Sequence, residues 1–225
     1  MIGIVSYGAY VPYRRLKRST IAEVLGVPPD KGERSVASFD EDSVSMAVEA
    51  ARDALRGASD GPIDALVFGT TTAPYADKLN AALVGAAAQL PFELRAADTT
   101  GSVRAGMTAL LQAADAVRGG ARRALAAIAD ARLAAPEAKA ERTNGDGAVA
   151  FVLGSDGVIA ELVATASFTR EFTDGWRRPD ETFPHSWEER FSLTQAYAPL
   201  LGKAVQTVLE KAGVPPADLA AVVLD

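Results

Sequence analysis

The chain contains no cysteine and a single histidine, His185, among its 225 residues. The absence of cysteine excludes disulfides, cysteine metal sites and a cysteine nucleophile. One histidine cannot build a His-based zinc site, and any Ser-His-Asp triad would have to use His185. The sequence therefore predicts neither a metal site nor cysteine chemistry.

Long apolar runs and an excess of basic residues are also lacking. Stretches such as 81–88 are far shorter than the roughly 18 residues needed to span a bilayer. The chain opens on strand-like sequence rather than on the basic region and apolar run of a signal peptide. The net charge of −6 argues against a dedicated nucleic-acid binder. We expect a cytoplasmic chain with neither a membrane nor a nucleic acid as partner.

The common site signatures are missing as well. The chain has no G-x-G-x-x-G after a strand, no P-loop, no H-E-x-x-H and no EF-hand pattern. These absences argue against dinucleotide, nucleotide-phosphate, zinc-protease and calcium sites.

What is present is an alternation of apolar runs and amphipathic helices, which predicts an α/β fold with much parallel sheet. Residues 170–193 form a polar, aromatic-bearing loop, and Gly145–Gly147 a tight turn. Thr20 and Glu23 fit a capping box that begins a helix, and acidic residues precede the helix at 44–56. The expected strands are 2–7, 63–69, 94–98, 123–130, 148–154, 158–167 and 219–224, and the other expected helices are 78–90, 103–117 and 198–212.

A weak internal repeat links residues 47–69 to residues 203–225, at an offset of about 157. Each copy is an amphipathic helix, a Gly/Pro turn and a strand, a pattern that any αβ unit shows. The second copy stops at its strand, which suggests that more sheet follows, either in a missing part or in a partner chain.

Several segments in order resemble one family. They are GIVSYGAYVP (3–12), DEDSVSMAVEAARDAL (40–55), IDALVFGTTTAPYA (63–76), AADTTGSVRAG (96–106) and GDGAVAFVLG (145–154). Together they resemble the HMG-CoA synthase branch of the thiolase superfamily, akin to ketoacyl synthase III, from residue 2 to residue 225. The resemblance implies a thiolase-like layered αβαβα sandwich. Its N-terminal half, 1–157, would be complete and its second half, 158–225, partial.

Catalysis in this family uses a cysteine that takes the acyl group, with a histidine and a glutamate for the condensation. The resemblance places these positions on Val103, Asp225 and Thr71 respectively. Valine has no nucleophilic atom, and threonine cannot act as a general base near neutral pH. The resemblance thus implies a catalytically degenerate protein that serves as an acyl-CoA-binding or structural partner of an acyl-CoA enzyme, with no cofactor beyond an acyl-CoA ligand.

The alternative is an active acyltransferase or condensing enzyme with a rebuilt or partner-supplied site. Ser102 joins a strand to a helix, where the helix dipole stabilises an anion, so it is the candidate nucleophile; otherwise it is a turn or N-cap serine. Trp176, Arg177 and Arg178 could stack on adenine and pair with CoA phosphates, or Trp176 could be a buried loop anchor.

The resemblance also implies partners. Relatives dimerise through the sheet edge near the nucleophile strand, here 94–98, so a homodimer or a heterodimer with a thiolase-like paralogue is expected. A zinc-ribbon/OB-fold protein that binds acyl-CoA is a further expected companion.

Overall fold

The computed structural model describes residues 1–29, 31–58 and 61–224. The chain divides into two compact units, Met1–Glu161 and Leu162–Asp225. Each unit is described by itself. The predicted thiolase-like halves, 1–157 and 158–225, stay a prediction.

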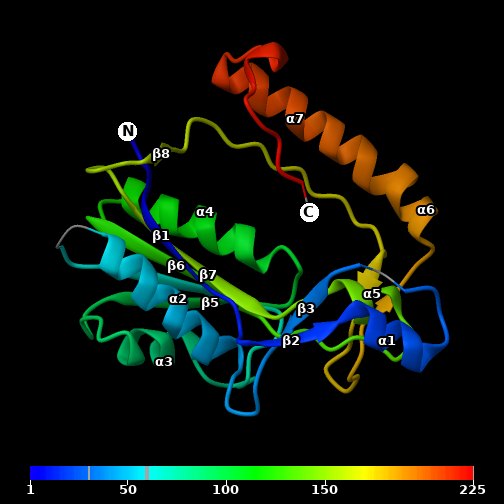
Figure 1. Cartoon of the computed structure of the whole chain (residues 1–225). Coiled ribbons are helices and arrows are strands. Elements are labelled where there is room, and N and C mark those ends of the chain that lie inside the picture. The colour runs from blue at the N-terminus through cyan, green and yellow to red at the C-terminus, as the bar shows by residue number, and fades with distance from the viewer. Residues whose placement is uncertain (30, 59–60, 225) are drawn as a thin grey trace. The chain divides into compact units, whose positions relative to one another are not determined.

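The first unit is built on a six-stranded mixed sheet in the order β5-β4-β6-β7-β1-β8 (Figure 1). β4 is parallel to both β5 and β6, whereas β7 is antiparallel to β6 and β1, and β8 is antiparallel to β1. A separate hairpin pairs β2 with β3. The strands are β1 (Gly3–Tyr10), β2 (Arg14–Lys17), β3 (Glu33–Val36), β4 (Ala65–Gly69), β5 (Arg95–Thr99), β6 (Arg123–Asp130), β7 (Gly147–Gly154) and β8 (Ala160–Glu161).

Helices cover both faces of this sheet. α2 (Ser43–Gly57) and α3 (Asn80–Ala87) lie on one face and α4 (Ala105–Arg118) on the other (Figure 1). All five residues of β4 are buried as a result, which explains the uninterrupted apolar run that predicted this strand. Two short helices, α1 (Arg18–Leu25) and α5 (Lys139–Thr143), complete the unit.

The helix starts test the capping predictions. α2 begins in a capping box, in which Asp42 accepts from the Ser45 amide at 2.7 Å and the Ser45 hydroxyl accepts from the Asp42 amide. The acidic start of this helix is therefore confirmed. The box predicted at Thr20 is wrong. α1 begins two residues earlier, at Arg18, whose amide donates to the Gly32 carbonyl at 3.0 Å, so the β2–β3 hairpin sets its start.

An ion pair joins the amino ends of β4 and β6. The Asp64 carboxylate accepts from the Arg122 amide at 2.7 Å and from its Nε at 2.9 Å. The hydrogen bonds from the Arg122 guanidinium and amide lower the pKa of Asp64 from 3.8 to about 2. The folded state therefore stabilises the ionised form of the Asp64 carboxylate relative to its protonated form.

This shift predicts an acid-sensitive step in stability. Because the folded-state pKa lies below the unfolded value, the contribution is complete above pH 3.8 and is lost as the pH falls through about 2. We expect Asp64→Asn to flatten the fall in denaturation midpoint between pH 4 and pH 2, as measured by chemical unfolding. An equally steep fall in the variant would contradict the assignment.

The second unit has little core of its own, since Ala196 is its one buried residue among those described. Its predicted helix at 198–212 is confirmed. The predicted loop at 170–193 holds a short hairpin and the start of a helix. The elements are β9 (Gly175–Trp176), β10 (His185–Ser186), α6 (Glu189–Ser192), a π-helical turn (Leu193–Tyr197), α7 (Ala198–Ala212) and a 3₁₀ turn (Pro216–Asp218).

Two predicted strands are wrong over most of their length. Of 158–167 only Ala160–Glu161 is strand, because β8 pairs with just Gly3 and Ile4 of β1. Residues 219–224 are not a strand in the described structure. A strand needs a neighbour for its backbone groups, and apolar sequence alone does not supply one.

None of the helices in the described ranges has the length and apolar character to cross a bilayer. The expected cytoplasmic location stays a prediction.

Candidate functional site

The carboxyl ends of three neighbouring strands meet at one edge of the first unit's sheet. Gly69 at the end of β4 is in register with Thr99 of β5 and Ile128 of β6. The Thr70 amide continues this contact and donates to the Thr99 carbonyl at 3.0 Å. In open α/β sheets, ligands bind outside such strand ends. We call residues 70–72, 99–104 and 130 the strand-end site.

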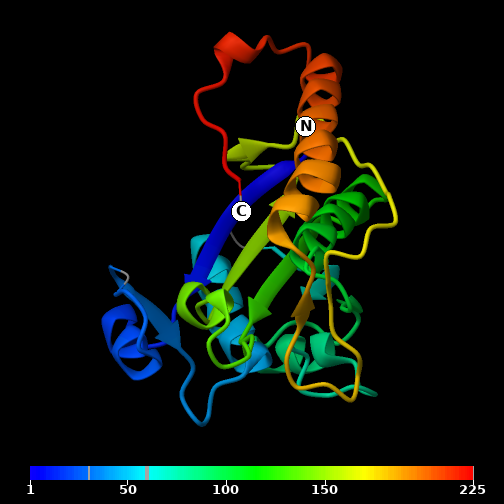
Figure 2. The ribbon, with the colours of Figure 1, turned by 90° about the vertical axis from the view of Figure 1, so that its right-hand side faces the viewer.

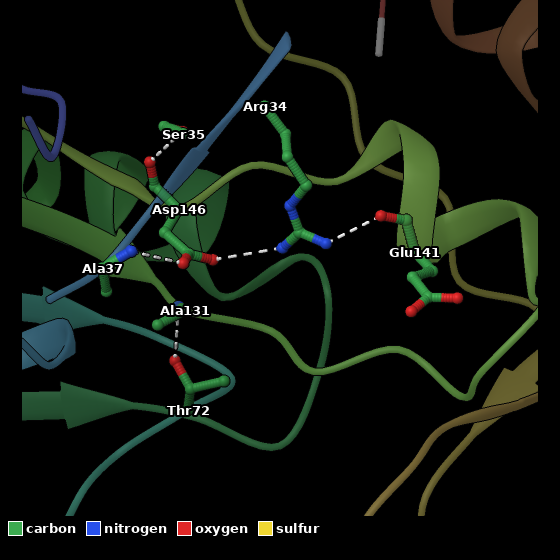
Figure 3. Close-up of polar contacts among 7 residues, drawn as sticks. All are labelled: Arg34, Ser35, Ala37, Thr72, Ala131, Glu141 and Asp146. Atoms are coloured by element: carbon green, nitrogen blue, oxygen red, sulfur yellow. Dashed lines mark hydrogen bonds and ion pairs between the residues drawn. The ribbon is translucent and has the colours of Figure 1, made fainter. Parts of the chain in front are cut away.

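Asp130 is the centre of this site. Its Oδ1 accepts from the Thr70 hydroxyl at 3.1 Å, from the Thr71 amide and hydroxyl at 2.7 and 2.9 Å, and from the Thr72 hydroxyl at 3.0 Å. The Thr72 oxygen in turn accepts from the Ala131 amide at 3.1 Å (Figure 3). One carboxylate at the end of β6 thereby fixes the loop that follows β4.

Thr71, at the position of the family glutamate, is therefore a hydrogen-bond donor. Its amide and its hydroxyl both donate to Asp130. A hydroxyl group cannot take up a proton near neutral pH, so Thr71 has no route to general-base catalysis.

Asp130 was missed by the sequence prediction, which saw only the last residue of a strand. The signal that could have found it is positional. A run of three threonines follows one parallel strand, and a carboxylate ends another, so the two meet once the strands are paired.

A turn at 100–104 joins β5 to α4. Gly101 adopts φ 78°, in the left-handed region, and the Ala105 amide donates to the Ser102 carbonyl at 2.9 Å. Val103, the position assigned to the family cysteine, is 77% exposed in this turn. The turn thus presents an apolar side chain, without a nucleophilic atom, just before a helix N-terminus.

Ser102 has a local partner in the same turn. Its Oγ accepts from the Arg104 amide at 3.1 Å. This contact agrees with the turn role named as the alternative for Ser102. Its role as a nucleophile stays a prediction.

A second carboxylate, Asp98 in β5, caps α3. It accepts from the amides of Asn80 and Ala81, each at 2.7 Å. Leu79, at the N-cap position, makes no side-chain cap of its own. Asp98 thus satisfies amides that would otherwise lack acceptors.

The predicted turn at Gly145–Gly147 leads into β7 and also forms hydrogen bonds to residues 35 and 37. Asp146 accepts from the Ala37 amide at 2.8 Å, and its carbonyl accepts from the Ser35 hydroxyl at 2.6 Å (Figure 3). The Arg34 guanidinium forms an ion pair with the Asp146 carboxylate, with Nη2 and Oδ1 3.8 Å apart. Its Nη1 donates to the Glu141 carbonyl at 2.7 Å. These contacts tie β3 to the segment around α5.

The proposed CoA contacts lie in the β9–β10 hairpin of the second unit. The Trp176 ring stacks on His185, with centroids 5.5 Å apart, and is 37% exposed. Glu181 organises the turn: its carboxylate accepts from the Arg178 amide at 2.7 Å, and its carbonyl from the Arg177 guanidinium at 3.2 Å. The sequence prediction missed the roles of His185 and Glu181.

The Glu181 carboxylate also faces His185, whose Nε2 lies 3.2 Å from its Oε1. The Arg178 amide, and then the charge of His185, lower the pKa of Glu181 below its usual value. The hairpin therefore carries a partly exposed Trp176, which is followed by the exposed residues Arg177 and Arg178.

Among the described residues, no group of three His, Cys, Asp or Glu side chains could hold a metal ion. Asp225, at the position of the family histidine, lies outside the described residues.

The chain is similar in sequence to archaeal hydroxymethylglutaryl-CoA synthases. It is 37% identical to that of Methanocaldococcus jannaschii over 97% of its own length and 66% of the relative's, and 36% identical to that of Pyrococcus furiosus over 96% and 63%. The chain therefore spans slightly less than two thirds of the length of these relatives. No protein-family model matches it.

Solved structures show the same fold. An HMG-CoA synthase complexed with CoA superposes with a TM-score of 0.84 at 22% identity, over 97% of this chain and 58% of that one. The 3-oxoacyl-(acyl carrier protein) synthase III of Pseudomonas aeruginosa gives 0.83 at 22% identity, over 97% and 73%. The thiolase-like α/β fold is thus confirmed. The chain belongs to the HMG-CoA synthase and ketoacyl synthase III-like branch of the thiolase superfamily.

Proposed function

We propose that this chain is a non-acylating member of its family, which binds acyl-CoA and acts as a partner in an acyl-CoA enzyme complex. The observation that carries the proposal is the exposed valine, Val103, in the turn between β5 and α4. A thioester cannot form without a nucleophilic atom at that position.

The neighbouring side chains support the same conclusion. Thr71 donates both its polar groups to Asp130 and has no basic atom to offer. The Ser102 Oγ accepts a hydrogen bond from the Arg104 amide, which agrees with a role in the turn. Asp130 itself is occupied in holding the threonine loop.

Binding of acyl-CoA is supported by the β9–β10 hairpin. The Trp176 ring stacks on His185 and the residue is 37% exposed, and an indole ring of this kind could also stack on an adenine ring. Arg177 and Arg178 are exposed beside it, and guanidinium groups match phosphate geometry. One solved structural neighbour is an HMG-CoA synthase complexed with CoA.

Calorimetric titration with acetyl-CoA tests the proposal. We expect saturable binding that protects the chain against thermal unfolding as the ligand concentration rises. Titration with free acetate supplies the control for a non-specific anion. Acetyl-CoA that neither binds nor protects would contradict the binding role.

Substitution of Trp176 tests the location of the ligand. We expect Trp176→Ala to weaken CoA binding by about tenfold, because one stacked base is worth about 1–3 kcal/mol. Trp187→Ala is the matched control, since Trp187 is also exposed, at 57%, and we expect it to leave affinity unchanged. Equal effects of the two variants would place CoA elsewhere.

A homodimer, or a heterodimer with a thiolase-like paralogue, is part of the proposal. β5 is the first strand in the order of the sheet, and an edge strand is a common place for pairing with another chain. Sedimentation of the chain alone and with a paralogue distinguishes the two. A zinc-ribbon/OB-fold companion stays a prediction from the resemblance.

A further inference from the structure

His185, the single histidine of the chain, contacts both an aromatic ring and a carboxylate. It lies in β10 directly opposite Trp176 of β9, and the two rings stack with their centroids 5.5 Å apart and their planes 18° apart. Its Nε2 lies 3.2 Å from Oε1 of Glu181, which belongs to the turn between the two strands. In Figure 2 the yellow-to-orange chain turns back on itself at this hairpin and then continues into α6. One imidazole therefore joins Trp176 to the turn.

Hydrogen bonds hold the hairpin and its turn in place. The Trp187 amide donates to the Asp174 carbonyl at 2.7 Å, next to the two paired positions. The Glu181 carboxylate accepts from the Arg178 amide through Oε2, whereas its Oε1 faces His185. The side chains of Glu181 and His185 are 26% and 52% exposed, so the pair is screened less than a fully exposed one.

His185 is the group of this hairpin whose charge changes near neutral pH, because histidine takes up or loses its proton between about pH 5 and pH 8. The hydrogen bond from the Arg178 amide holds the pKa of Glu181 below its usual value, so this carboxylate stays ionised in that range. Arg177 and Arg178 stay charged as well. Among the described residues, Glu181 is the one acid that forms an ion pair with His185.

Protonation strengthens both contacts of His185. The imidazolium ion and the Glu181 carboxylate attract each other as opposite charges. A cation over the face of an indole ring gains a cation–π attraction in addition to the stacking. Both effects restrict the Trp176 ring, and a side chain that is already ordered loses less conformational freedom when a ligand binds to it.

We propose that His185 is a positioning residue for the CoA ligand, and that its protonation tightens CoA binding by fixing the Trp176 ring. The inference rests on the proposed function, because it needs Trp176 to carry the adenine ring. The charge that His185 gains also attracts the phosphate groups of CoA, as do Arg177 and Arg178, so the two effects have the same sign.

The first readout needs no ligand. The chain has two tryptophans, so Trp187→Phe leaves Trp176 as the single one beside the single histidine. We expect its indole fluorescence to change between pH 8 and pH 5.5, as His185 gains its proton. The change should disappear when His185→Phe is added, because phenylalanine keeps an aromatic ring opposite Trp176 but gains no charge.

The second readout is the affinity for acetyl-CoA, measured by calorimetric titration at pH 8 and pH 5.5. The ligand titrates too, because a phosphate monoester has a second pKa of about 6. The His185→Phe variant reports this effect of the ligand alone, so the native chain is compared with it. We expect the ratio of native to variant affinity to rise about threefold from pH 8 to pH 5.5, the size of one exposed cation–π contact.

Glu181→Gln tests the carboxylate, because it removes the charge that attracts the imidazolium ion and keeps an oxygen acceptor in the turn. We expect it to reduce the gain in affinity to less than about twofold. Glu188→Gln is the matched control, since the Glu188 carboxylate accepts from the amides of Arg190 and Phe191. It should keep the full gain.

The outcomes separate this inference from the proposed function. Equal pH profiles of affinity for the native chain and His185→Phe would overturn the inference and leave CoA binding intact. A native affinity that falls relative to His185→Phe at low pH would also contradict it, because His185 would then compete with adenine for Trp176. Fluorescence of Trp176 that ignores pH would remove the link between the two rings. Acetyl-CoA that binds at neither pH would overturn both proposals.

Discussion

Gly8→Ala is expected to destabilise the first unit by about 3 kcal/mol or more, because the added methyl group would have no space in a tightly packed contact. Gly8 lies in β1, directly against the backbone of α2. A Cβ there would overlap the Ala54 amide nitrogen and lie 2.5 Å from the Ala50 carbonyl oxygen. These are helix backbone atoms, so α2 would have to move away from the sheet.

Thermal unfolding measures this effect, and we expect a midpoint lower by about 10 °C for a unit of this size. Gly57→Ala is the control, since a Cβ at Gly57 would meet only the Ser6 Cβ at 3.6 Å. It should change the midpoint little. A Gly8→Ala variant as stable as the control would show that α2 is not packed this closely on β1.

Asp130→Ala is expected to cost about 2–4 kcal/mol and to release the loop at 70–72, because hydrogen bonds to a charged group are worth about 1.5–3 kcal/mol each and are not additive. Asp130 accepts from all three threonines through one oxygen. Asp130→Asn keeps an oxygen acceptor and should lose less. Chemical unfolding measures the cost, and hydrogen exchange at the Thr71 and Thr72 amides reports the loop.

Asp115→Ala provides the comparison. Asp115 pairs with Arg118 on the exposed surface of α4, so its loss should cost less than about 1 kcal/mol. If Asp130→Ala costs no more than Asp115→Ala, the carboxylate does not organise the strand-end site.

The layered part of the fold was predictable because its patterns are local. The buried run of β4 and the helical spacing of α2 each carry their own signal, and Asp42 marks the start of α2. The strand at 219–224 failed for the opposite reason. Its apolar residues satisfy the pattern, but a strand exists only where another backbone pairs with it.

The candidate site was predictable only in part. The resemblance assigned Thr71 and Val103, and the fold places both after strands whose carboxyl ends adjoin. The role of Asp130 depends on which strand lies next to β4, and the role of His185 on the β9–β10 pairing that brings it against Trp176. Such contacts between distant segments have no signature in either segment alone.

The intact mass of the chain after incubation with acetyl-CoA tests the central claim most directly. The M. jannaschii HMG-CoA synthase, treated in parallel, is the positive control for acyl transfer. The account predicts an unchanged mass, because Val103 offers no nucleophile and Ser102 serves the turn. A gain of one acetyl group that disappears in Ser102→Ala would contradict it and make Ser102 the nucleophile of an active enzyme.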